Sequence, residues 1–419
     1  MGRFRRYALL VAVLGLNALA WTVSLALGPT GLPLRRVAAE FFSSSAVVLM
    51  SANIVLATRP FVLDRLYGGL DKLFVSHRAN GVAVALAVAS HFSLMPESPG
   101  LSPVKLLAYT NITLVLVSVG LAIAPRSPWR KFVPLSYHHW KLEHRFMGIF
   151  LSFAVLHSLV VHPIMLSLPI ERTWLYGMAT LGLLSYVYRE FAERFVKERH
   201  LYRVAETRRV GDDVLEIALA PAERPIAHRA GQFAFVRFDG GPSREQHPFT
   251  LSAAPQPSEA LRLSVKASGD WTAALQEHLT VGSAARIEGA YGGFDFHRGG
   301  QRQLWLAGGI GITPFLAFLG DAELDCDVRL IWSVPMQIEA AGYLPEIQRS
   351  LAEHPNIAFE LWVSGTQGRL RLDALGLERP DELSAFVCGP VPMRDAFVVQ
   401  LGVLGVARRE TYYEEFSLR

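Results

Sequence analysis

Long uncharged runs dominate the chain up to about residue 190, and charged residues return at ordinary density beyond it. A run of about 20 apolar residues is long enough to cross the hydrocarbon core of a bilayer as a helix. The pattern therefore predicts a membrane domain followed by a water-soluble half. Six membrane-spanning helices are expected, at residues 7–27, 37–58, 77–95, 106–124, 146–161 and 173–188.

The periodicity changes after residue 202, where closely spaced short strands replace the long apolar runs. Stretches such as FAFVRF, PFTLSA and LRLSVKA predict a small antiparallel β-barrel. After about residue 302, apolar strands such as LWLAGG and VRLIWSV alternate with helices, which is typical of a parallel, Rossmann-like α/β sheet. The expected fold is multi-domain: a six-helix transmembrane bundle over residues 1–192, an antiparallel β-barrel over 193–300 and an α/β domain over 301–419.

Composition narrows the class of protein. Hydrophobic residues make up 51% of the 419-residue chain, and the net charge of +4 comes without a basic tract that would bind nucleic acid. Cys326 and Cys388 are far apart in the soluble half, which predicts no disulfide framework and fits a reducing compartment.

Cations gather in alternate loops, so the positive-inside rule puts both termini and the soluble half in the cytoplasm. The opening MGRFRR and its apolar run are interpreted as an uncleaved first helix rather than a signal peptide, because the run is long and more spans follow. The protein is expected to cross a bacterial-type plasma membrane several times.

Two of the expected spans carry the same pattern, HRANGVAVALAVASH and HRFMGIFLSFAVLH. Ionisable residues inside spans are costly and are functional by default, and histidine is an axial ligand of haem iron. Both spans run in the same direction, so His77 and His144 lie at the inner level and His91 and His157 near the outer level. This arrangement predicts two haems, each bound by two histidines, at levels about 20 Å apart.

The spacing of the two patterns differs by one residue. Fourteen residues from His77 to His91 are close to four helical turns, whereas the thirteen from His144 to His157 fall short by about a third of a turn. A bent helix or rotated haem planes must absorb this difference.

Glycines and arginines next to the inner histidines fit the same hypothesis. Gly81 and Gly148, one turn beyond them, let a flat macrocycle approach the backbone, and Arg78 and Arg145 can pair with its propionates. The alternative is that the histidines only hydrogen-bond between helices. That alternative is reasonable for one histidine and disfavoured for four in a repeated, depth-matched frame.

Two motifs of the soluble half suit a flavin. HPFTLS lies on an expected barrel strand, where its hydroxyls and backbone can line a flavin ring and its histidine can contact the diphosphate or ribose. VKASGDWT forms a turn before a helix, and backbone amides at a helix start suit a diphosphate. The candidate residues are His247, Pro248, Phe249, Thr250, Ser252, Lys266, Trp271 and Thr272.

Two further motifs suit a nicotinamide nucleotide. GGIGITP follows an apolar strand and precedes a helix, so its backbone can approach a phosphate, although an ordinary tight turn would have the same composition. CGP ends a later strand at the same expected sheet edge, where Thr313 and Cys388 could flank a nicotinamide; alternatively Cys388 is a small buried residue. The candidates are Gly308, Gly309, Gly311, Thr313, Pro314, Cys388, Gly389 and Pro390.

In this order the motifs resemble the NADPH oxidase and ferric reductase family of transmembrane flavocytochromes, over nearly the whole chain. The resemblance implies two b-type haems, FAD, NADPH or NADH, and a ferredoxin reductase-like soluble half. It implies a path from cytosolic NAD(P)H through FAD, the inner haem and the outer haem to an acceptor beyond the membrane. Phe416, in the C-terminal YYEEFSLR, would cover the flavin ring.

The acceptor implied by the oxidases of that family is dioxygen, with superoxide as the product. Their oxygen site contains an arginine that Arg36, or Arg35, would supply, and a histidine whose position holds Met95 here. This departure keeps a ferric chelate or another acceptor open as an alternative. An alternative of another class, a haem-binding subunit of a partner reductase, is disfavoured because flavin and nucleotide motifs share the chain.

Two further expectations follow. No subunit-binding segment is evident, so no obligatory regulatory subunit is expected. SVPMQIE, after the second strand of the α/β domain, offers no arginine for a ribose 2′-phosphate, whereas Arg369 and Arg371 could reach it, which slightly favours NADPH over NADH.

Overall fold

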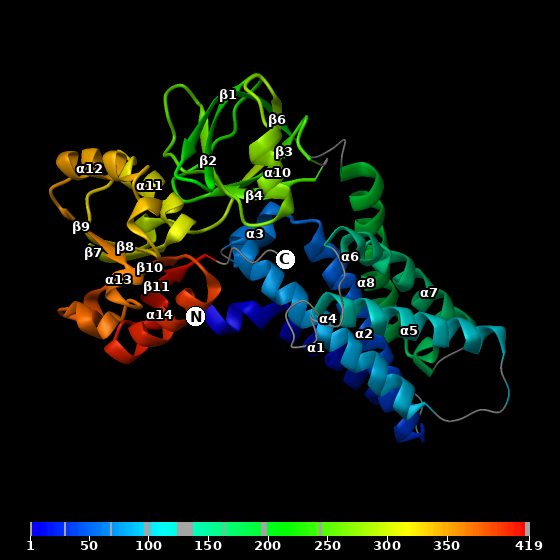
Figure 1. The fold of residues 1–419 in the computed structure, drawn as a ribbon. Coiled ribbons are helices and arrows are strands. Elements are labelled where there is room, and N and C mark those ends of the chain that lie inside the picture. Colours follow the sequence, from blue (N-terminus) through cyan, green and yellow to red (C-terminus); the bar gives the residue numbers. More distant parts are fainter. Residues whose placement is uncertain are drawn as a thin grey trace. The chain divides into compact units, whose positions relative to one another are not determined.

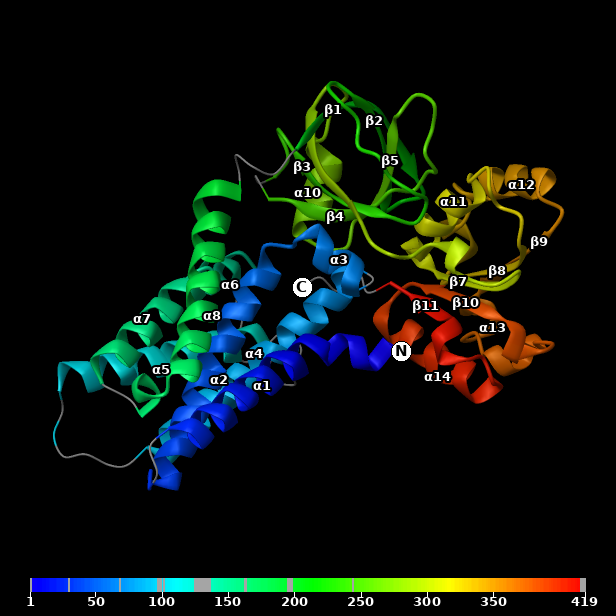
Figure 2. The same ribbon diagram turned by 180° about the vertical axis from the view of Figure 1, so that it is seen from behind.

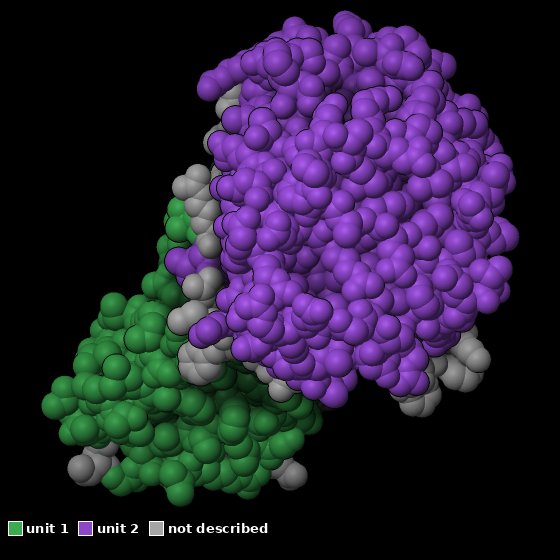
Figure 3. Space-filling model, turned by 90° about the vertical axis from the view of Figure 1, so that its left-hand side faces the viewer, with its two compact units in different colours: residues 1, 3–63, 72–196 green, residues 2, 64–71, 197–419 purple. Residues whose placement is uncertain are grey.

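The chain folds into a helical part and a part that carries two β-sheets (Figure 1). The computed structural model describes residues 2–28, 31–67, 69–95, 100, 102–123, 137–161, 164–193, 199–242 and 245–414. Two compact units are formed by residues 1, 3–63 and 72–196 and by residues 2, 64–71 and 197–419 (Figure 3).

The helices of the first unit pack mainly through α2. This helix lies against α8, and α7 lies against α5 (Figures 1 and 2). Gly182 lets α8 approach α2 closely, because a methyl group there would lie 2.8 Å from the Cα of Ser51. The helices are α1 (Gly2–Leu27), α2 (Leu34–Ala57), α3 (Phe61–Tyr67), α4 (Leu70–Leu94), α5 (Pro103–Ile123), α6 (Tyr137–His144), α7 (Met147–Val160) and α8 (Pro169–Val187), with a π-helical turn η4 (Tyr188–Ala192) after α8.

Among the described residues, four helices, α1, α2, α4 and α5, are long and apolar enough to cross a membrane. The expectation of six spans is therefore met for four. α8 has 19 residues and α7 only 14. At about 1.5 Å per residue α7 is roughly 21 Å long, less than the hydrocarbon thickness of about 30 Å. The chain turns at Arg145 and Phe146, so His144 ends α6 and does not belong to the same helix as His157.

The first sheet of the second unit is antiparallel, in the order β4-β3-β6-β1-β2-β5. A bridge between Leu251 and Leu263 joins the end of β4 to β5, so the sheet curls back on itself. Alternate side chains fill its interior, among them Val204, Ile217 and Leu263. The strands are β1 (His200–Val210), β2 (Val214–Pro221), β3 (Phe233–Phe238), β4 (His247–Thr250), β5 (Leu261–Lys266) and β6 (Ala284–Tyr291), and α10 (Asp270–His278) follows β5.

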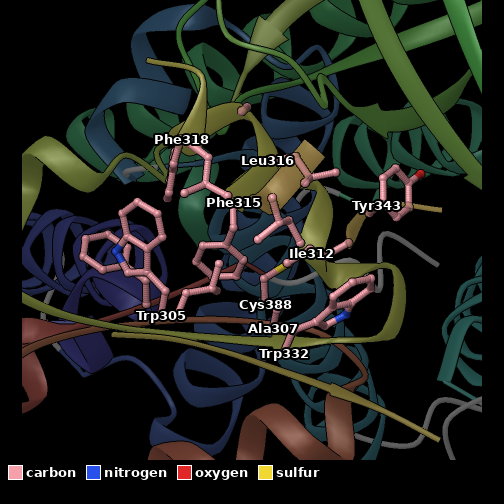
Figure 4. Close-up of a cluster of buried hydrophobic side chains, with 14 of the residues drawn as sticks. Trp305, Ala307, Ile312, Phe315, Leu316, Phe318, Trp332, Tyr343 and Cys388 are labelled. Carbon is pink, nitrogen blue, oxygen red and sulfur yellow. The ribbon is translucent and has the colours of Figure 1, made fainter. Parts of the chain in front are cut away.

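The second sheet is parallel, in the order β11-β10-β7-β8-β9. Trp305, Phe315 and Trp332 belong to the large core on one of its faces (Figure 4). The strands are β7 (Arg302–Gly308), β8 (Asp327–Val334), β9 (Ile357–Val363), β10 (Ser384–Cys388) and β11 (Thr411–Tyr413), and the main helices are α11 (Thr313–Leu319), α12 (Leu344–Glu353) and α14 (Val391–Leu404).

Charged side chains join the two sheets within this unit. Arg262 on β5 donates to both carboxylate oxygens of Glu346 on α12, at 2.9 and 2.5 Å. Such a two-bonded pair fixes orientation as well as distance.

The aromatic core predicts a large loss of stability when Phe318 is truncated. Its fully buried ring packs against Phe296 and Trp305, with ring centres 5.2 Å away in both cases. We expect Phe318→Ala to lower the free energy of unfolding by about 3–5 kcal/mol, since the cavity cannot collapse fully. Thermal unfolding of the purified full-length protein measures the change. Val281→Ala, at a side chain 61% exposed, is the control and should stay within about 0.5 kcal/mol.

Candidate functional site

The inner pair of histidines meets in the helical unit. His77 on α4 and His144 at the end of α6 have ring centres 6.0 Å apart, with ring planes at 76°. The Nδ1 atoms of both are buried without a hydrogen-bond partner. Trp140 stacks on His144 at 5.4 Å, and Asn53 of α2 donates to the His77 carbonyl at 3.0 Å. The His144 ring thus has an aromatic neighbour on its own helix, and α2 binds the backbone at His77.

The outer pair differs in its hydrogen bonding. Nδ1 of His91 lies 2.8 Å from the carbonyl oxygen of Ala39 on α2. A donating Nδ1–H leaves Nε2 with a free lone pair, which is the form that binds a metal. His157 on α7 lies near enough to His91 to interact electrostatically, and its own Nδ1 is buried without a partner.

The break between α6 and α7 lies between the two histidines whose spacing is a third of a turn short. Single-turn backbone bonds cross it, from Arg145 N to the Leu142 carbonyl and from Phe146 N to the Glu143 carbonyl. An interrupted helix can thereby rotate His144 relative to His157.

The two glycines next to the inner histidines differ. A methyl group on Gly81 would meet only Asn53 Nδ2, at 3.8 Å, so the backbone there can be approached closely. A methyl group on Gly148 would lie 2.2 Å from the ring of Tyr186, so that space belongs to a tyrosine of α8. Only Gly81 has the open side that a macrocycle would need.

The arginines near the histidines have protein partners. Arg145 donates to the carboxylate of Glu190, from Nε at 3.0 Å. Arg36 donates to Glu40, one turn along α2, at 3.2 Å, and Arg35 donates to the carbonyls of Leu94, at 3.0 Å, and Met95. Arg78 follows His77 on α4 and is half-buried.

These residues fit haem better than a bare metal ion. Two imidazoles bound to opposite sides of one iron, at about 2 Å each, have ring centres about 6 Å apart, and the inner pair has 6.0 Å. In the described part of the chain there is no group of three or more histidine, cysteine or acidic side chains placed to hold an ion. A porphyrin supplies the four ligands that two histidines lack.

The flavin-motif residues come together on the curled sheet. His247 on β4 stacks on Trp271 of α10, with ring centres 3.7 Å apart, and Phe249 lies 6.2 Å from the same indole. Pro248, which lies between His247 and Phe249 in the sequence, is half-buried. Thr250 at the end of the strand is buried. The HPFT strand and the start of α10 therefore form one aromatic-lined surface.

Three flavin-motif residues have partners within the protein. Ser252 is buried, with its hydroxyl 3.2 Å from that of Ser264. Thr272 Oγ1 accepts from the amides of residues 268 and 269, so those two amides are already satisfied. Lys266 pairs with Asp213 at 3.1 Å and Glu339 at 3.4 Å.

The carboxylates of Asp213 and Glu339 occupy the ammonium group of Lys266, whose expected role is to bind the flavin diphosphate. Burial lowers its pKa, but the two carboxylates outweigh burial, and the net pKa is raised. A diphosphate at Lys266 would have to replace these carboxylates. Its place in a flavin site stays a prediction.

The two nucleotide motifs are neighbours at one edge of the parallel sheet. β7 pairs with β10, and Ala307 lies opposite Cys388. A methyl group on Gly311 would lie 2.4 Å from the Cys388 carbonyl oxygen, and one on Gly389 would lie 3.1 Å from Gly308. Gly309 has φ +52°, a left-handed conformation that suits glycine, and its carbonyl accepts from Trp332 Nε1 at 2.9 Å. The glycines are thus needed for this close packing.

Cys388 and Thr313 are both buried. Cys388 belongs to the same core as Ile312 and Phe315 (Figure 4), and the Thr313 hydroxyl donates to the Ile310 carbonyl at 3.0 Å. Pro314 occupies the first turn of α11, and Pro390, after Gly389, precedes α14. Phe416 lies outside the described residues.

Sequence reasoning missed Glu414, directly after β11. This carboxyl is 5% exposed and acts electrostatically on the Cys388 thiol. The acidic pair in the aromatic tail YYEEF is the sequence signal that could have identified it.

The two arginines proposed for a 2′-phosphate are exposed and differ in their contacts. Arg371 binds both carboxylate oxygens of Asp373. Arg369 lies on the preceding loop, between α13 (Ser364–Gln367) and the turn that begins at Leu372.

Comparisons with known proteins agree with this division. A family model described as an FAD-binding domain matches residues 200–298. NADPH oxidase 3 of Rattus norvegicus is 25% identical over 333 residues, covering 67% of this chain and 56% of that protein. Ferric reduction oxidase 7, chloroplastic, of Arabidopsis thaliana is 24% identical over 223 residues, covering 46% of this chain and 30% of that protein. The chain spans less than two thirds of the length of either relative.

Among solved structures, flavohemoglobin from Malassezia yamatoensis with bound FAD and heme has a TM-score of 0.52 at 20% identity, covering 91% of this chain and 96% of that one. At this identity the likeness concerns the fold alone. The second unit has a ferredoxin reductase-like FAD/NAD fold with a curled antiparallel sheet.

The burial of the two cysteines predicts that neither is reactive in the folded protein. Burial raises the pKa of Cys326 to about 11, and burial followed by the charge of Glu414 raises that of Cys388 well above its usual range. The thiolate is the reactive form, so a raised pKa leaves little of it near pH 8. We expect iodoacetamide at pH 8 to leave both unmodified by mass spectrometry until the protein is unfolded. Fast alkylation of folded Cys388 would contradict its placement.

Proposed function

We propose that this protein, which its FAD-binding match and its oxidase and reductase relatives assign to the NADPH oxidase and ferric reductase family, carries electrons across a membrane. In this proposal they pass from NAD(P)H through FAD and two b-type haems to an acceptor on the far side. The observation that carries it is the half-buried pair His77 and His144, with ring centres 6.0 Å apart, in one chain with an FAD/NAD fold.

The proposed layout has three parts. Residues 1–192 form the di-haem domain with six spans, residues 193–300 bind FAD, and residues 301–419 bind the nucleotide. α8, at 19 residues, is about 28 Å long and close to the thickness of a bilayer core. α7 would complete the six despite its shorter length. Both termini and the soluble parts are assigned to the cytoplasm.

Each group of residues has a distinct task in this path. FAD, when bound, supplies the conversion of a two-electron hydride into single electrons. His247, Phe249 and Trp271 offer it an aromatic surface, and Thr250 and Thr272 lie beside them. The glycine-rich edge of β7 and β10 brings the nucleotide close to the backbone. Cys388 closes that edge, with Phe416 assigned to cover the flavin.

The histidines and arginines serve the membrane part. The imidazoles of His77 and His144 and of His91 and His157 hold iron from two sides at two levels. Arg78 is assigned to a propionate, as is Arg145, which would share its guanidinium with Glu190. The break after His144 turns that ring toward α4.

Dioxygen is the acceptor we assign, with superoxide as product and Arg36 at the site. The specific observation behind a second candidate, ferric-chelate reduction, is Met95, an apolar residue where the oxidases have a histidine. A haem-binding subunit for a partner reductase is a weaker third candidate, since the FAD-binding match lies in this chain. For the nucleotide we favour NADPH, with Arg369 near the 2′-phosphate, because Arg371 is held by Asp373.

The two-haem assignment predicts a stepwise loss of haem. We expect two haems and one FAD per wild-type chain by pyridine haemochrome assay and flavin quantitation. His77→Ala or His144→Ala should remove about one haem, and His91→Ala or His157→Ala the other, because one imidazole cannot hold a low-spin iron from both sides. His297→Ala, on an exposed loop of the second unit, is the control and should keep both. Unchanged haem content in all four variants would falsify the assignment.

The acceptor is tested by the product. With NADPH in air, we expect oxygen consumption and a dismutase-sensitive superoxide signal from the reconstituted full-length protein. Arg36→Ala should reduce the superoxide rate while the rate of haem reduction by NADPH stays within about twofold, since the change lies downstream of flavin. Ferric-chelate reduction insensitive to superoxide dismutase would instead favour the reductase.

A further inference from the structure

A fully buried carboxyl lies on a helix that carries none of the four histidines. Glu171 is in the first turn of α8, and its side chain is 0% exposed. Neither carboxyl oxygen has a hydrogen-bond partner. An ionised carboxylate in such surroundings is strongly disfavoured unless it is paired or takes up a proton. In a membrane segment an ionisable residue of this kind is a functional site by default.

The polar groups around Glu171 satisfy one another instead of the carboxyl. Ser44 Oγ accepts from Asn17 Nδ2 at 3.0 Å and from Trp21 Nε1 at 2.8 Å. The Ser44 hydroxyl donates to the Phe41 carbonyl at 3.1 Å. These donors are therefore committed, although Ser44 and Trp21 are close neighbours of Glu171.

No charged group of the described residues faces the carboxyl. The described titratable side chains of the helices packed on it are Tyr7 on α1, Arg35, Arg36 and Glu40 on α2, His157 on α7, Arg172, Tyr176 and Tyr186 on α8, and Tyr188, Arg189 and Glu190 on η4. Arg36 and Glu40 pair with each other, and Arg172 is exposed. The charge of Glu171 is thus governed by burial, by the nearby Ser44 hydroxyl and Trp21 N–H, which favour the anion, and by its own helix.

Two opposing effects act on that charge. Burial favours the neutral acid, whereas the N-terminus of a 19-residue helix favours the anion. The backbone N–H of Glu171 is already used, since it donates to Ser24 Oγ at 3.0 Å. When opposing effects balance, a modest change in the nearby electric field is enough to move a proton on or off the group.

Helix α2 connects this carboxyl to the outer histidines. Ser44 lies beside Glu171, and Ala39, five residues earlier on α2, accepts from His91. Five residues are about 7.5 Å along a helix. Charges at separations of this order interact appreciably where little water screens them.

We propose that Glu171 is a proton-binding site whose occupancy follows the redox state of the outer histidine pair, an inference that rests on the proposed function. His91 and His157 would hold haem iron, whose reduction by one electron would lower the positive charge at that level by one. The Glu171 carboxylate then takes one proton from the water at that face of the membrane and becomes the carboxylic acid. When the electron passes to the acceptor, the proton returns to the water, so charge balances over a cycle.

Redox titration at several pH values tests this proposal. The holoprotein in lipid nanodiscs is titrated while haem absorbance is followed. We expect the midpoint potential of one of the two haem transitions to fall as pH rises in the wild type. Glu171→Gln, of the same shape, should make that transition independent of pH, and Glu171→Asp should keep the dependence. Glu353→Gln, at an exposed site of α12, is the matched control and should leave it unchanged.

Infrared difference spectra give a readout that does not depend on potentials. A carboxylic-acid C=O band should grow on reduction of the wild type, shift in Glu171→Asp and be missing in Glu171→Gln. If two haems are present but the wild type has neither the band nor a pH-dependent transition, Glu171 is not such a site and the proposed function stands. If the pH dependence persists in a folded Glu171→Gln, another group carries the proton. Absence of haem from the wild type overturns the proposed function as well.

Discussion

A polar group buried among membrane helices has no water with which to form hydrogen bonds, and this constraint determines how the polar side chains of the first unit are placed. Polar side chains of this unit form hydrogen bonds between helices, as Asn17 and Trp21 of α1 do with Ser44 of α2. Other buried polar atoms of the described residues have no hydrogen-bond partner, and they include Nδ1 of His77 and of His144 and both carboxyl oxygens of Glu171. A chain that tolerates such costs in its interior gains something else from these groups.

The second unit meets a different constraint, the close approach of two backbone segments. Gly311 touches the carbonyl of Cys388, and Gly389 faces Gly308, so two segments far apart in sequence meet without side chains between them. Parallel pairing of β7 and β10 makes this possible, because their carboxyl ends share one edge. The buried, protonated thiol of Cys388 therefore contributes shape to that edge rather than nucleophilic reactivity.

The hydrophobic periodicity of the sequence predicted the order of strands and helices in the second unit. The alternation from short strands to strand–helix units predicted a curled antiparallel sheet before a parallel one, and both are present. The order of motifs predicted the family that the relatives support. These features depend on side-chain periodicity and turn chemistry, which a single sequence contains.

Long-range contacts were beyond the sequence. The sequence around Lys266 does not predict its ion pair with Glu339, which lies in a turn after β8. The apolar run after His144 does not predict a turn at Arg145. Glu171 reads as an ordinary first-turn acid of a helix, and only packing reveals that it is buried. The number of spans is met for four of the six expected, because the lengths of the remaining helices depend on tertiary contacts that set the helix ends.

The shortness of α7 bears on the lipid around the protein. In the proposed six-span layout, this helix of 14 residues would leave a hydrophobic mismatch of roughly 9 Å against an average bilayer, which lipids relieve by local thinning. His144 lies just before that helix, at the end of the polar segment α6. An electron entering there would have less insulating hydrocarbon left to cross than at any of the four longer helices.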